Sequence, residues 1–267
     1  MDFSFSEDQD KFRQEVIEWL ESNITPEIEA ENKISEMGPG PHAKAFQKKM
    51  GEAGYLGIGW PKEFGGQGAP PMNQYIFYEE LSKRGVQIPT LTLSSVGPTI
   101  AMAGTEQQKL EYLPKILTGE IEFALGYTEP GAGTDLASLQ TRAVIDGDDF
   151  VINGQKVFTL AAHHATHVWL AVRTDPEARK HRGISIIIVP IDTPGITIRP
   201  LWHLGDGRTN EVFYENVRVP RQNLVGELNQ GWYLAATALD FERVGSGHYD
   251  SISTRLQKII KYAKETL

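Results

Sequence analysis

The sequence lacks cysteine, has fewer positive than negative charges, and contains no long apolar run. Without cysteine, the chain cannot form disulfides, thiolate metal sites or cysteine nucleophiles. Lys and Arg number 26 against 35 Asp and Glu, a net charge of −9, which argues against a nucleic-acid partner. The longest apolar run, Ile184 to Ile191, is only long enough for a strand. The acidic N-terminus is unlike a signal peptide, so we expect a soluble, cytoplasmic protein with no membrane span.

What is present is an ordinary globular composition, with 40% hydrophobic and 23% charged residues. The first 120 residues are typical of a helical domain. Ser6 and Gln9 form a predicted capping box, and Phe12, Val16, Trp19 and Leu20 then recur at helical spacing. Thr105 and Gln108 form a second box. We expect further helices around Phe46 and Met50, over 73–83 and over 96–103, and a structured glycine-rich loop over 54–68.

From residue 122 the apolar period changes from near four to two. Turn chemistry at Asp146-Gly147 and at Asn153-Gly154 predicts hairpins at both places. Short strands with turns between them predict an antiparallel barrel or sandwich. The predicted strands cover 123–127, 141–145, 150–152, 167–174, 183–190, 196–201 and 212–219.

After Gly226 the helical period returns, and one stripe of the predicted helix contains Trp232, Ala235, Ala236, Leu239 and Arg243. The chain is therefore predicted to be a multidomain α+β protein. The helical domain covers 1–120, the β domain covers 121–228, and residues 229–267 form the first helices of a third, helical domain.

Two motifs suggest other chemistry and are rejected. The segment 38–43 (GPGPHA) fits the dinucleotide pattern G-x-G-x-x-A, but it follows no strand, and its prolines remove backbone donors. His163, His164 and His167 could suggest a metal cluster. They stand where a loop meets a predicted strand and no carboxylate lies within ten residues before them, so we predict no metal site.

Three other stretches are hard to explain by packing alone. Residues 125–135 (LGYTEPGAGTD) lead from a strand into a loop with two glycines and two threonines, which suits close approach to a ligand. Residues 153–159 (NGQKVFT) put an aromatic side chain beside a hydroxyl. Residues 239–243 (LDFER) set charges into an otherwise apolar helix.

These stretches resemble the acyl-CoA dehydrogenase family. YTEPGAGTD is similar to the family's T-E-P-x-A-G-S/T-D signature, and NGQKVFT to its N-G-x-K-x-W-x-T/S segment. The resemblance extends over nearly the whole chain through NEVFYENVRVP, GWPKEFGG and GTEQQKLEYLPKILTGE. It agrees with the α–β–α layout, which on its own excludes the Rossmann-type flavoenzymes.

The resemblance implies that the chain binds FAD. Residues Leu125, Gly126, Tyr127, Thr128, Gly133 and Thr134 would line the flavin, with Tyr127 and Thr128 near the polar edge of its ring and Thr134 near the pyrophosphate or the substrate. Phe158 occupies the position where the family usually has Trp. Leu160 stands where many members have Ser or Thr, so one flavin hydrogen bond is absent or is made by Thr159 instead.

The resemblance also implies a reaction, in which an acyl-CoA thioester loses its α-proton to a base and its β-hydrogen as hydride to the flavin. Glu242 is the expected base, since a desolvated carboxylate of raised pKa can take such a proton. Asp240 and Arg243 match positions that contact the CoA part of the substrate. Electron-transfer flavoprotein is the implied electron acceptor, and a homo- or hetero-oligomer is implied for the full-length enzyme.

The family's third domain is a helical bundle, which stops here after its opening helices. Three explanations stay open: a fragment or truncated product of an active enzyme, a subunit completed by another chain, or a non-catalytic binding subunit. Acyl-CoA oxidase is a further alternative within the same fold. The acyl chain of the substrate cannot be predicted, because it depends on pocket depth.

Overall fold

The computed structural model describes residues 4–33, 39–86, 88–204, 207–243 and 247–266, except for the side chains of residues 33, 241–243, 247–251 and 254. Its helices are α1 (Glu7–Asn23), α2 (Pro26–Lys33), α3 (Pro41–Glu52), α4 (Pro71–Lys83), α5 (Gly97–Ala103), α6 (Glu106–Leu117), α7 (Gly231–Arg243) and α8 (Gly247–Thr266). Short helical turns are η2 (Tyr55–Gly57), η3 (Lys62–Phe64), the π-helical η4 (Thr92–Val96), η5 (Leu136–Ser138), η6 (Lys180–Gly183) and η7 (Arg221–Asn223).

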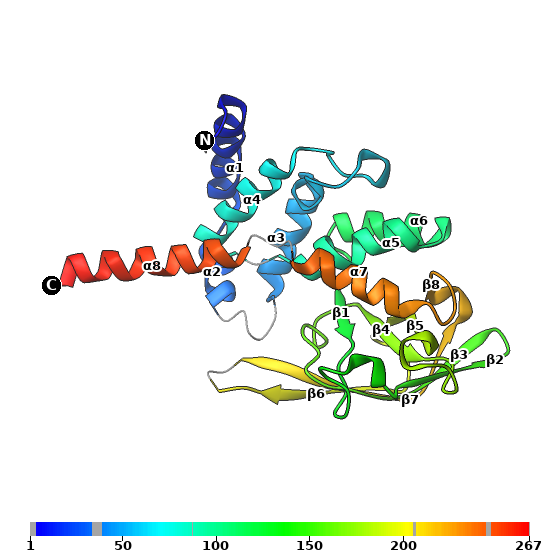
Figure 1. Cartoon of the computed structure of the whole chain (residues 1–267). Coiled ribbons are helices and arrows are strands. Elements are labelled where there is room, and N and C mark those ends of the chain that lie inside the picture. The colour runs from blue at the N-terminus through cyan, green and yellow to red at the C-terminus, as the bar shows by residue number, and fades with distance from the viewer. Residues whose placement is uncertain (1–3, 34–38, 87, 205–206, 244–246, 267) are drawn as a thin grey trace.

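The strands follow α6 and form one eight-stranded sheet. They are β1 (Phe123–Gly126), β2 (Arg142–Asp146), β3 (Asp149–Lys156), β4 (His167–Arg173), β5 (Ile184–Pro190), β6 (Ile196–Trp202), β7 (Arg208–Pro220) and β8 (Leu224–Val225). The predicted order of a helical part, a β part and returning helices is confirmed (Figure 1).

Both predicted capping boxes are present and explain where α1 and α6 begin. The Ser6 hydroxyl accepts a hydrogen bond from the Gln9 N–H (3.3 Å), and the Gln9 side chain accepts one from the Ser6 N–H (2.9 Å). Thr105 and Gln108 repeat the arrangement at 3.2 and 3.0 Å. Two orphan N–H groups of each helix are thus paired.

The sheet is mixed rather than purely antiparallel. Its order is β6-β7-β3-β2-β4-β5-β8, and β1 also pairs with β4. Neighbours along this order run antiparallel, except that β2 joins β4 in parallel through Arg142 and Arg173. The pairing of β1 with β4 is parallel as well. The hairpin signals could not show these two contacts, because both join strands that are distant in sequence.

The predicted hairpin at Asn153-Gly154 is wrong. Strand β3 continues through these residues to Lys156, with a register shift against β7 between Ile152 and Gly154. The cause is visible at Gly154, where φ is 154° and a Cβ atom would lie 2.6 Å from the Thr141 backbone. Asparagine before glycine marks a bulge here rather than a chain reversal.

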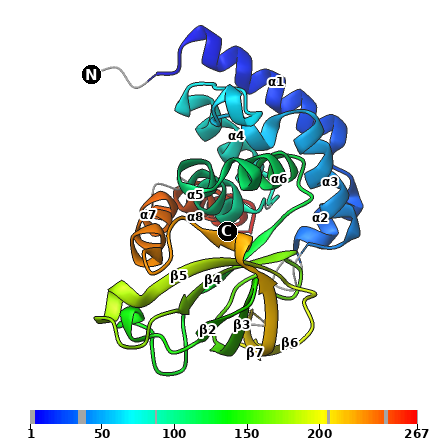
Figure 2. The same cartoon turned by 90° about the vertical axis from the view of Figure 1, so that its right-hand side faces the viewer.

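The two central strands are buried on both faces. Along β4, Trp169 and Ala171 join the core shared with the helices, whereas Val168, Leu170 and Val172 join a second core. The helices cover the first face of the sheet (Figure 2). Phe150 of β3 and Tyr214 of β7 enter the second core, so the sheet bends over it. This double burial explains why β5 is an almost continuous apolar run.

Specific hydrogen bonds fasten the helices to the sheet. The Gln108 side chain donates to the carbonyls of Gln222 (2.8 Å) and Leu224 (2.9 Å). Helix α7 lies against β5 and α5, and its Ala238 carbonyl accepts a hydrogen bond from the buried Ser95 hydroxyl at 2.6 Å. Helix α8 extends away from the sheet (Figure 1). Within the described ranges, no helix has the length and apolarity needed to cross a membrane.

Candidate functional site

The loop after β1 presents an open backbone. Glu129 and Ala132 exchange two backbone hydrogen bonds of 3.1 Å, which closes a tight turn. Gly133 and Thr134 follow it and are exposed. A Cβ atom placed on Gly131 or Gly133 would meet nothing within 4 Å, so none of the described residues covers the loop at these two positions. A ligand can therefore approach the backbone of residues 131–134 closely.

The earlier residues of the predicted flavin-lining segment face the protein interior. A Cβ atom on Gly126 would lie 2.6 Å from Leu170, so packing against that side chain already explains this glycine. The Tyr127 ring is buried, and its hydroxyl accepts a hydrogen bond from the Trp169 indole at 3.0 Å. Leu125 packs partly buried against the core. These residues can offer a ligand their backbone groups more readily than their side chains.

The segment after β3 is built around one buried hydroxyl. Phe158 and Leu160 are 62% and 63% exposed, whereas Thr159 between them is only 1% exposed. The Thr159 hydroxyl oxygen is buried and has no hydrogen-bond partner among the described residues. Phe158 has a φ of 56°, a strained value for a residue with a side chain. Such a combination is typical of a binding site rather than of a packed turn.

Asn210 on β7 holds this segment in place. Its backbone N–H and carbonyl pair with Thr159 at 3.1 and 3.0 Å, and its side-chain amide donates a further hydrogen bond to the Thr159 carbonyl at 2.9 Å. The Asn210 side-chain oxygen accepts a hydrogen bond from Arg208 at 3.0 Å. Asn210 itself is fully buried.

A buried ion pair brings the two segments together. The Lys156 ammonium lies 2.8 Å from the Glu129 carboxylate and also donates to the Tyr127 carbonyl at 3.0 Å. Next to it, the Val157 N–H donates to the Thr128 carbonyl at 2.8 Å. The end of β3 therefore runs beside residues 127–129. The loop 131–134, which is exposed except at Ala132, and the segment 158–160 both begin at this junction.

Both members of the pair are ionised at neutral pH. Burial lowers the pKa of Lys156 to about 8, although the attraction of Glu129 opposes this effect. Burial alone would raise the pKa of Glu129, but the charge of Lys156 and the hydrogen bond from it outweigh burial and lower that pKa. A charged pair in this position fits the short contact between the two side chains.

The sequence prediction missed Glu129, Lys156 and Asn210. The first two lie inside the two motifs that were noticed for their glycines, hydroxyls and aromatic ring. Their opposite charges within otherwise apolar strand ends could have suggested a pair. Asn210 opens the segment NEVFYENVRVP, which was noticed only for its resemblance, and it lies in a strand that the prediction began only at residue 212.

The predicted catalytic helix is α7. Asp240 lies on it and is exposed, and among the described residues no hydrogen bond or ion pair joins it to either loop. Glu242 and Arg243 are the final two residues of α7. The structure does not describe their side chains. The predicted stripe is wrong at Ala236, which is exposed, whereas Ala235 and Ala238 are buried.

The histidines have partners within the protein. The His164 ring lies 3.1 Å from the Glu122 carboxylate, and the His163 ring lies 3.1 Å from the Asn210 amide. His167 packs against Tyr112 and Phe123, and burial lowers its pKa to about 4. In the described part of the chain, no three side chains of metal-ligating type come together.

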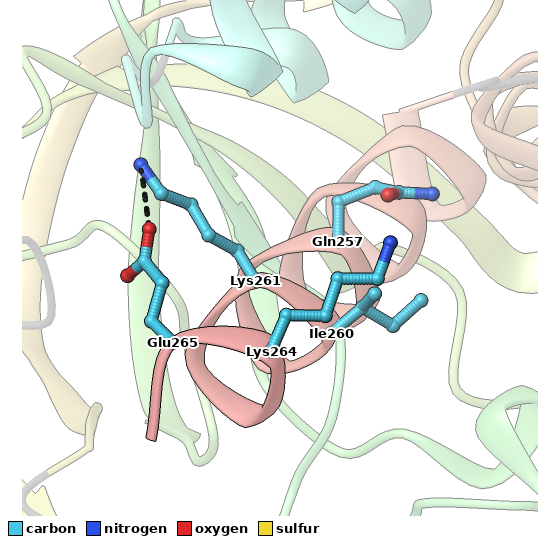
Figure 3. Close-up of a pocket in the computed structure, with 5 residues that line it drawn as sticks. All are labelled: Gln257, Ile260, Lys261, Lys264 and Glu265. Atoms are coloured by element: carbon cyan, nitrogen blue, oxygen red, sulfur yellow. Dashed lines mark ion pairs between the residues drawn. The ribbon is translucent and has the colours of Figure 1, made fainter. Parts of the chain in front are cut away.

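A shallow depression on α8 lies apart from these loops. Figure 3 shows that its lining comes from a single helix. Lys261 and Glu265 form an ion pair of 3.8 Å at its edge. The lining residues are Gln257, Ile260, Lys261, Lys264 and Glu265. One face of an exposed helix does not enclose a ligand, so this depression is not the candidate site.

Two family models match the chain. "Acyl-CoA dehydrogenase, N-terminal domain" matches residues 6–120, and "Acyl-CoA dehydrogenase, middle domain" matches residues 124–217. The structure is similar to a solved structure titled "Tcur3481-Tcur3483 steroid ACAD", with a TM-score of 0.91 and 44% identity over 100% of this chain and 69% of that one.

Two curated relatives come from Mycobacterium tuberculosis. "Acyl-CoA dehydrogenase FadE29" is 48% identical over 93% of this chain, and "Acyl-CoA dehydrogenase FadE26" is 44% identical over 100% of it. The chain spans 65% and 68% of their respective lengths, about two thirds in each case. The family models cover the helical part and the β part of the fold, and the relatives extend over nearly the whole chain. The chain belongs to the acyl-CoA dehydrogenase family, whose members are oxidoreductases that generally bind FAD.

Proposed function

We propose that this chain contains the flavin site of an FAD-dependent acyl-CoA dehydrogenase that converts an acyl-CoA thioester to the trans-2-enoyl-CoA. The observation that carries the proposal is the buried, unpartnered hydroxyl of Thr159 between the exposed side chains of Phe158 and Leu160. A buried polar atom without a partner costs about 1–3 kcal/mol, so a ligand that pairs with it is favoured. In this proposal residues 1–120, 121–228 and 229–267 are the three domains.

FAD fits the residues that surround this hydroxyl. Phe158 offers an exposed aromatic face to the flat ring, and the Thr159 hydroxyl offers a hydrogen bond to a polar ring atom. The open backbone from Gly131 to Thr134 would receive the pyrophosphate, while Tyr127 and Thr128 would contribute backbone groups. FAD bound there would accept the hydride that leaves the β-carbon of the substrate.

Glu242 is the proposed base. Its carboxylate would take the α-proton as the α C–H bond breaks, and the electron pair of that bond would form the new double bond as hydride leaves the β-carbon. Asp240, on the exposed side of α7, and Arg243 would contact the CoA part of the substrate. The tight contact between Ala238 and Ser95 supports a fixed placement of this helix over β5.

The proposed substrate class follows from the name of a similar protein. Because a structure with a TM-score of 0.91 is called a steroid ACAD, we propose that the acyl group of the substrate is attached to a steroid. The proposed electron acceptor is electron-transfer flavoprotein, as the family resemblance implies.

The test is anaerobic reduction of the flavin-loaded protein. We expect the purified chain to take up FAD and to lose its visible flavin absorbance on addition of a steroid side-chain acyl-CoA, more readily than with straight-chain acyl-CoA thioesters. Glu242→Gln should keep the flavin but slow bleaching by a factor of 10²–10⁴, the usual contribution of a general base. A protein that takes up no flavin contradicts the proposal. Fast reoxidation by dioxygen alone would identify an oxidase instead.

A second candidate function is that of a subunit that needs a partner chain. Two observations favour it. The similar structure is named for two proteins, and α8 carries an exposed apolar stripe made of Ile252, Leu256, Ile259 and Ile260. This candidate predicts that bleaching requires a longer family member that co-purifies with the chain. If the partner alone supplies catalysis, Glu242→Gln leaves the complex fully active.

A further inference from the structure

Two charged residues in the loop motifs have no role in the proposed function. Lys156 is 0% exposed and Glu129 is 6% exposed, and their side chains are 2.8 Å apart. They stand at the junction from which both proposed flavin loops begin. Neither side chain can contact a ligand that approaches from solvent, because both are buried. Their role must therefore concern the backbone around them.

The hydrogen bonds of the pair tie three separate backbone segments together. Lys156 donates to the Tyr127 carbonyl at 3.0 Å as well as to Glu129. The Glu129 carboxylate accepts the backbone N–H groups of Gln140 (2.6 Å) and Thr141 (2.8 Å). The end of β3, the loop after β1 and the approach to β2 therefore share one buried network.

Stability alone does not account for a charged pair in this place. Burying two charges costs desolvation energy that their attraction barely recovers, and an apolar pair of similar volume often serves the fold as well. Hydrogen bonds are directional, whereas apolar contacts are not. A hydrogen-bonded pair therefore fixes which backbone groups lie opposite each other. Here the groups so fixed are those that carry the two open loops.

We propose that Lys156 and Glu129 are a positioning pair, which sets the loop 131–134 and the segment 158–160 at the spacing that FAD requires. The inference rests on the proposed function, because it names FAD as the ligand. The pair acts through the backbones of Tyr127, Val157 and Thr141 and does not touch the flavin. Its loss should therefore weaken FAD binding more than it weakens the fold.

The experiment compares FAD affinity with the stability of the apoprotein. FAD is titrated into the apo form of the whole chain, with quenching of flavin fluorescence as the signal, and apoprotein melting is recorded in parallel. The variants are Lys156→Met, Glu129→Gln and the double variant. The matched control is Lys180→Met, which removes an exposed ion pair (2.5 Å) with Asp135 at the far end of the same loop.

We expect each single variant to raise the Kd for FAD at least tenfold, and the control to change it less than twofold. The double variant should recover the melting temperature lost in the single variants but not the FAD affinity. Recovery of both together would mean a merely structural pair and would overturn the proposal. A Kd within threefold of the wild-type value in the single variants would overturn it as well.

Two further measurements cover the remaining outcomes. If Lys156→Met does not fold, Glu129→Asp keeps the charge but shortens the side chain, and the same tenfold rise is expected. Hydrogen exchange of the amides in 127–134 tests the pair without flavin, and exchange at least tenfold faster in the variants is expected. If the wild-type chain takes up no FAD, the proposed function fails. Unchanged exchange overturns the positioning pair.

Discussion

Asn210 and Thr159 are joined by three hydrogen bonds, two between their backbones (3.0 and 3.1 Å) and one from the Asn210 side-chain amide to the Thr159 carbonyl (2.9 Å). Strand β3 ends at Lys156, so this contact extends the pairing with β7 beyond the strand. The strained residue Phe158 lies directly before it. One buried side chain on β7 thus supports the segment that carries the exposed aromatic ring.

Replacing Asn210 with leucine should destabilise the protein. The substitution keeps the volume but removes the donor to Thr159 and the acceptor for Arg208, and such losses cost about 1–3 kcal/mol of unfolding free energy. Urea unfolding at neutral pH measures the change. Gln155→Leu, which removes a half-buried amide contact with Glu211 between the same two strands, should cost less than about 0.5 kcal/mol. Equal losses in the two variants would argue against the special role of Asn210.

Replacing Thr159 with valine should have opposite effects on the fold and on the ligand. The unpartnered buried hydroxyl disappears, so the apoprotein should become more stable by up to about 1–2 kcal/mol. FAD affinity should fall about tenfold, because a hydrogen bond to the ring is lost. Melting of the apoprotein and a flavin titration measure the two effects. Thr197→Val, at an exposed position of β6, should change neither quantity.

FAD affinity should decrease as the pH rises through about 8. Burial lowers the pKa of Lys156 to about 8, so the ammonium loses its proton above this pH and Glu129 loses its counter-charge. Arg173 is the other charge that acts on Lys156, and it stays protonated throughout. Flavin titrations between pH 7 and 9.5 should show a several-fold increase in Kd. Lys156→Arg, which keeps its charge, should flatten the profile, and a flat wild-type profile would contradict the prediction.

His167 should make the protein less stable in mild acid. Its folded pKa of about 4 lies below the value of about 6.5 expected for the unfolded chain. Between about pH 4 and 6.5 the unfolded state binds one more proton than the folded state. The free energy of unfolding that neutral His167 contributes is therefore fully present above about pH 6.5 and decreases as the pH falls toward 4. The loss is on the order of 3 kcal/mol.

The variant His167→Phe tests this pH dependence. Phenylalanine can pack against Tyr112 and Phe123 without taking up a proton, so unfolding free energies at pH 4.5 and 7 should lie closer together than in the wild type. His203→Gln, at an exposed histidine, serves as the control and should keep the wild-type slope. An unchanged slope in His167→Phe would assign the acid sensitivity to other groups.

Local chemistry predicted much of the fold. The capping boxes at Ser6 and Thr105 and the change of period after residue 120 depend on neighbouring residues, and the structure reproduces them. The parallel contact of β1 with β4 and the bulge at Gly154 were not predictable. Both depend on residues brought together from distant parts of the chain, such as Thr141 against Gly154.

The candidate site divides in the same way. The exposed Phe158 and the open glycines of residues 131–134 were marked by residue type. Residue type did not show that the Tyr127 ring faces inward or that Gly126 is required by packing. Both features depend on Trp169 and Leu170, which lie on another strand. Whether a loop residue offers its side chain or its backbone depends on such partners.

The double burial of β5 has a consequence for how the chain finds its alignment during folding. Every residue from Ile184 to Val189 except Ser185 is apolar, so a slip of one position would exchange the two faces without exposing a charge. Hydrophobic alternation therefore does not select the correct alignment. A slip would also remove the Ser185 hydroxyl from its contact with the Thr174 hydroxyl at 2.7 Å, so this buried polar contact favours the observed alignment.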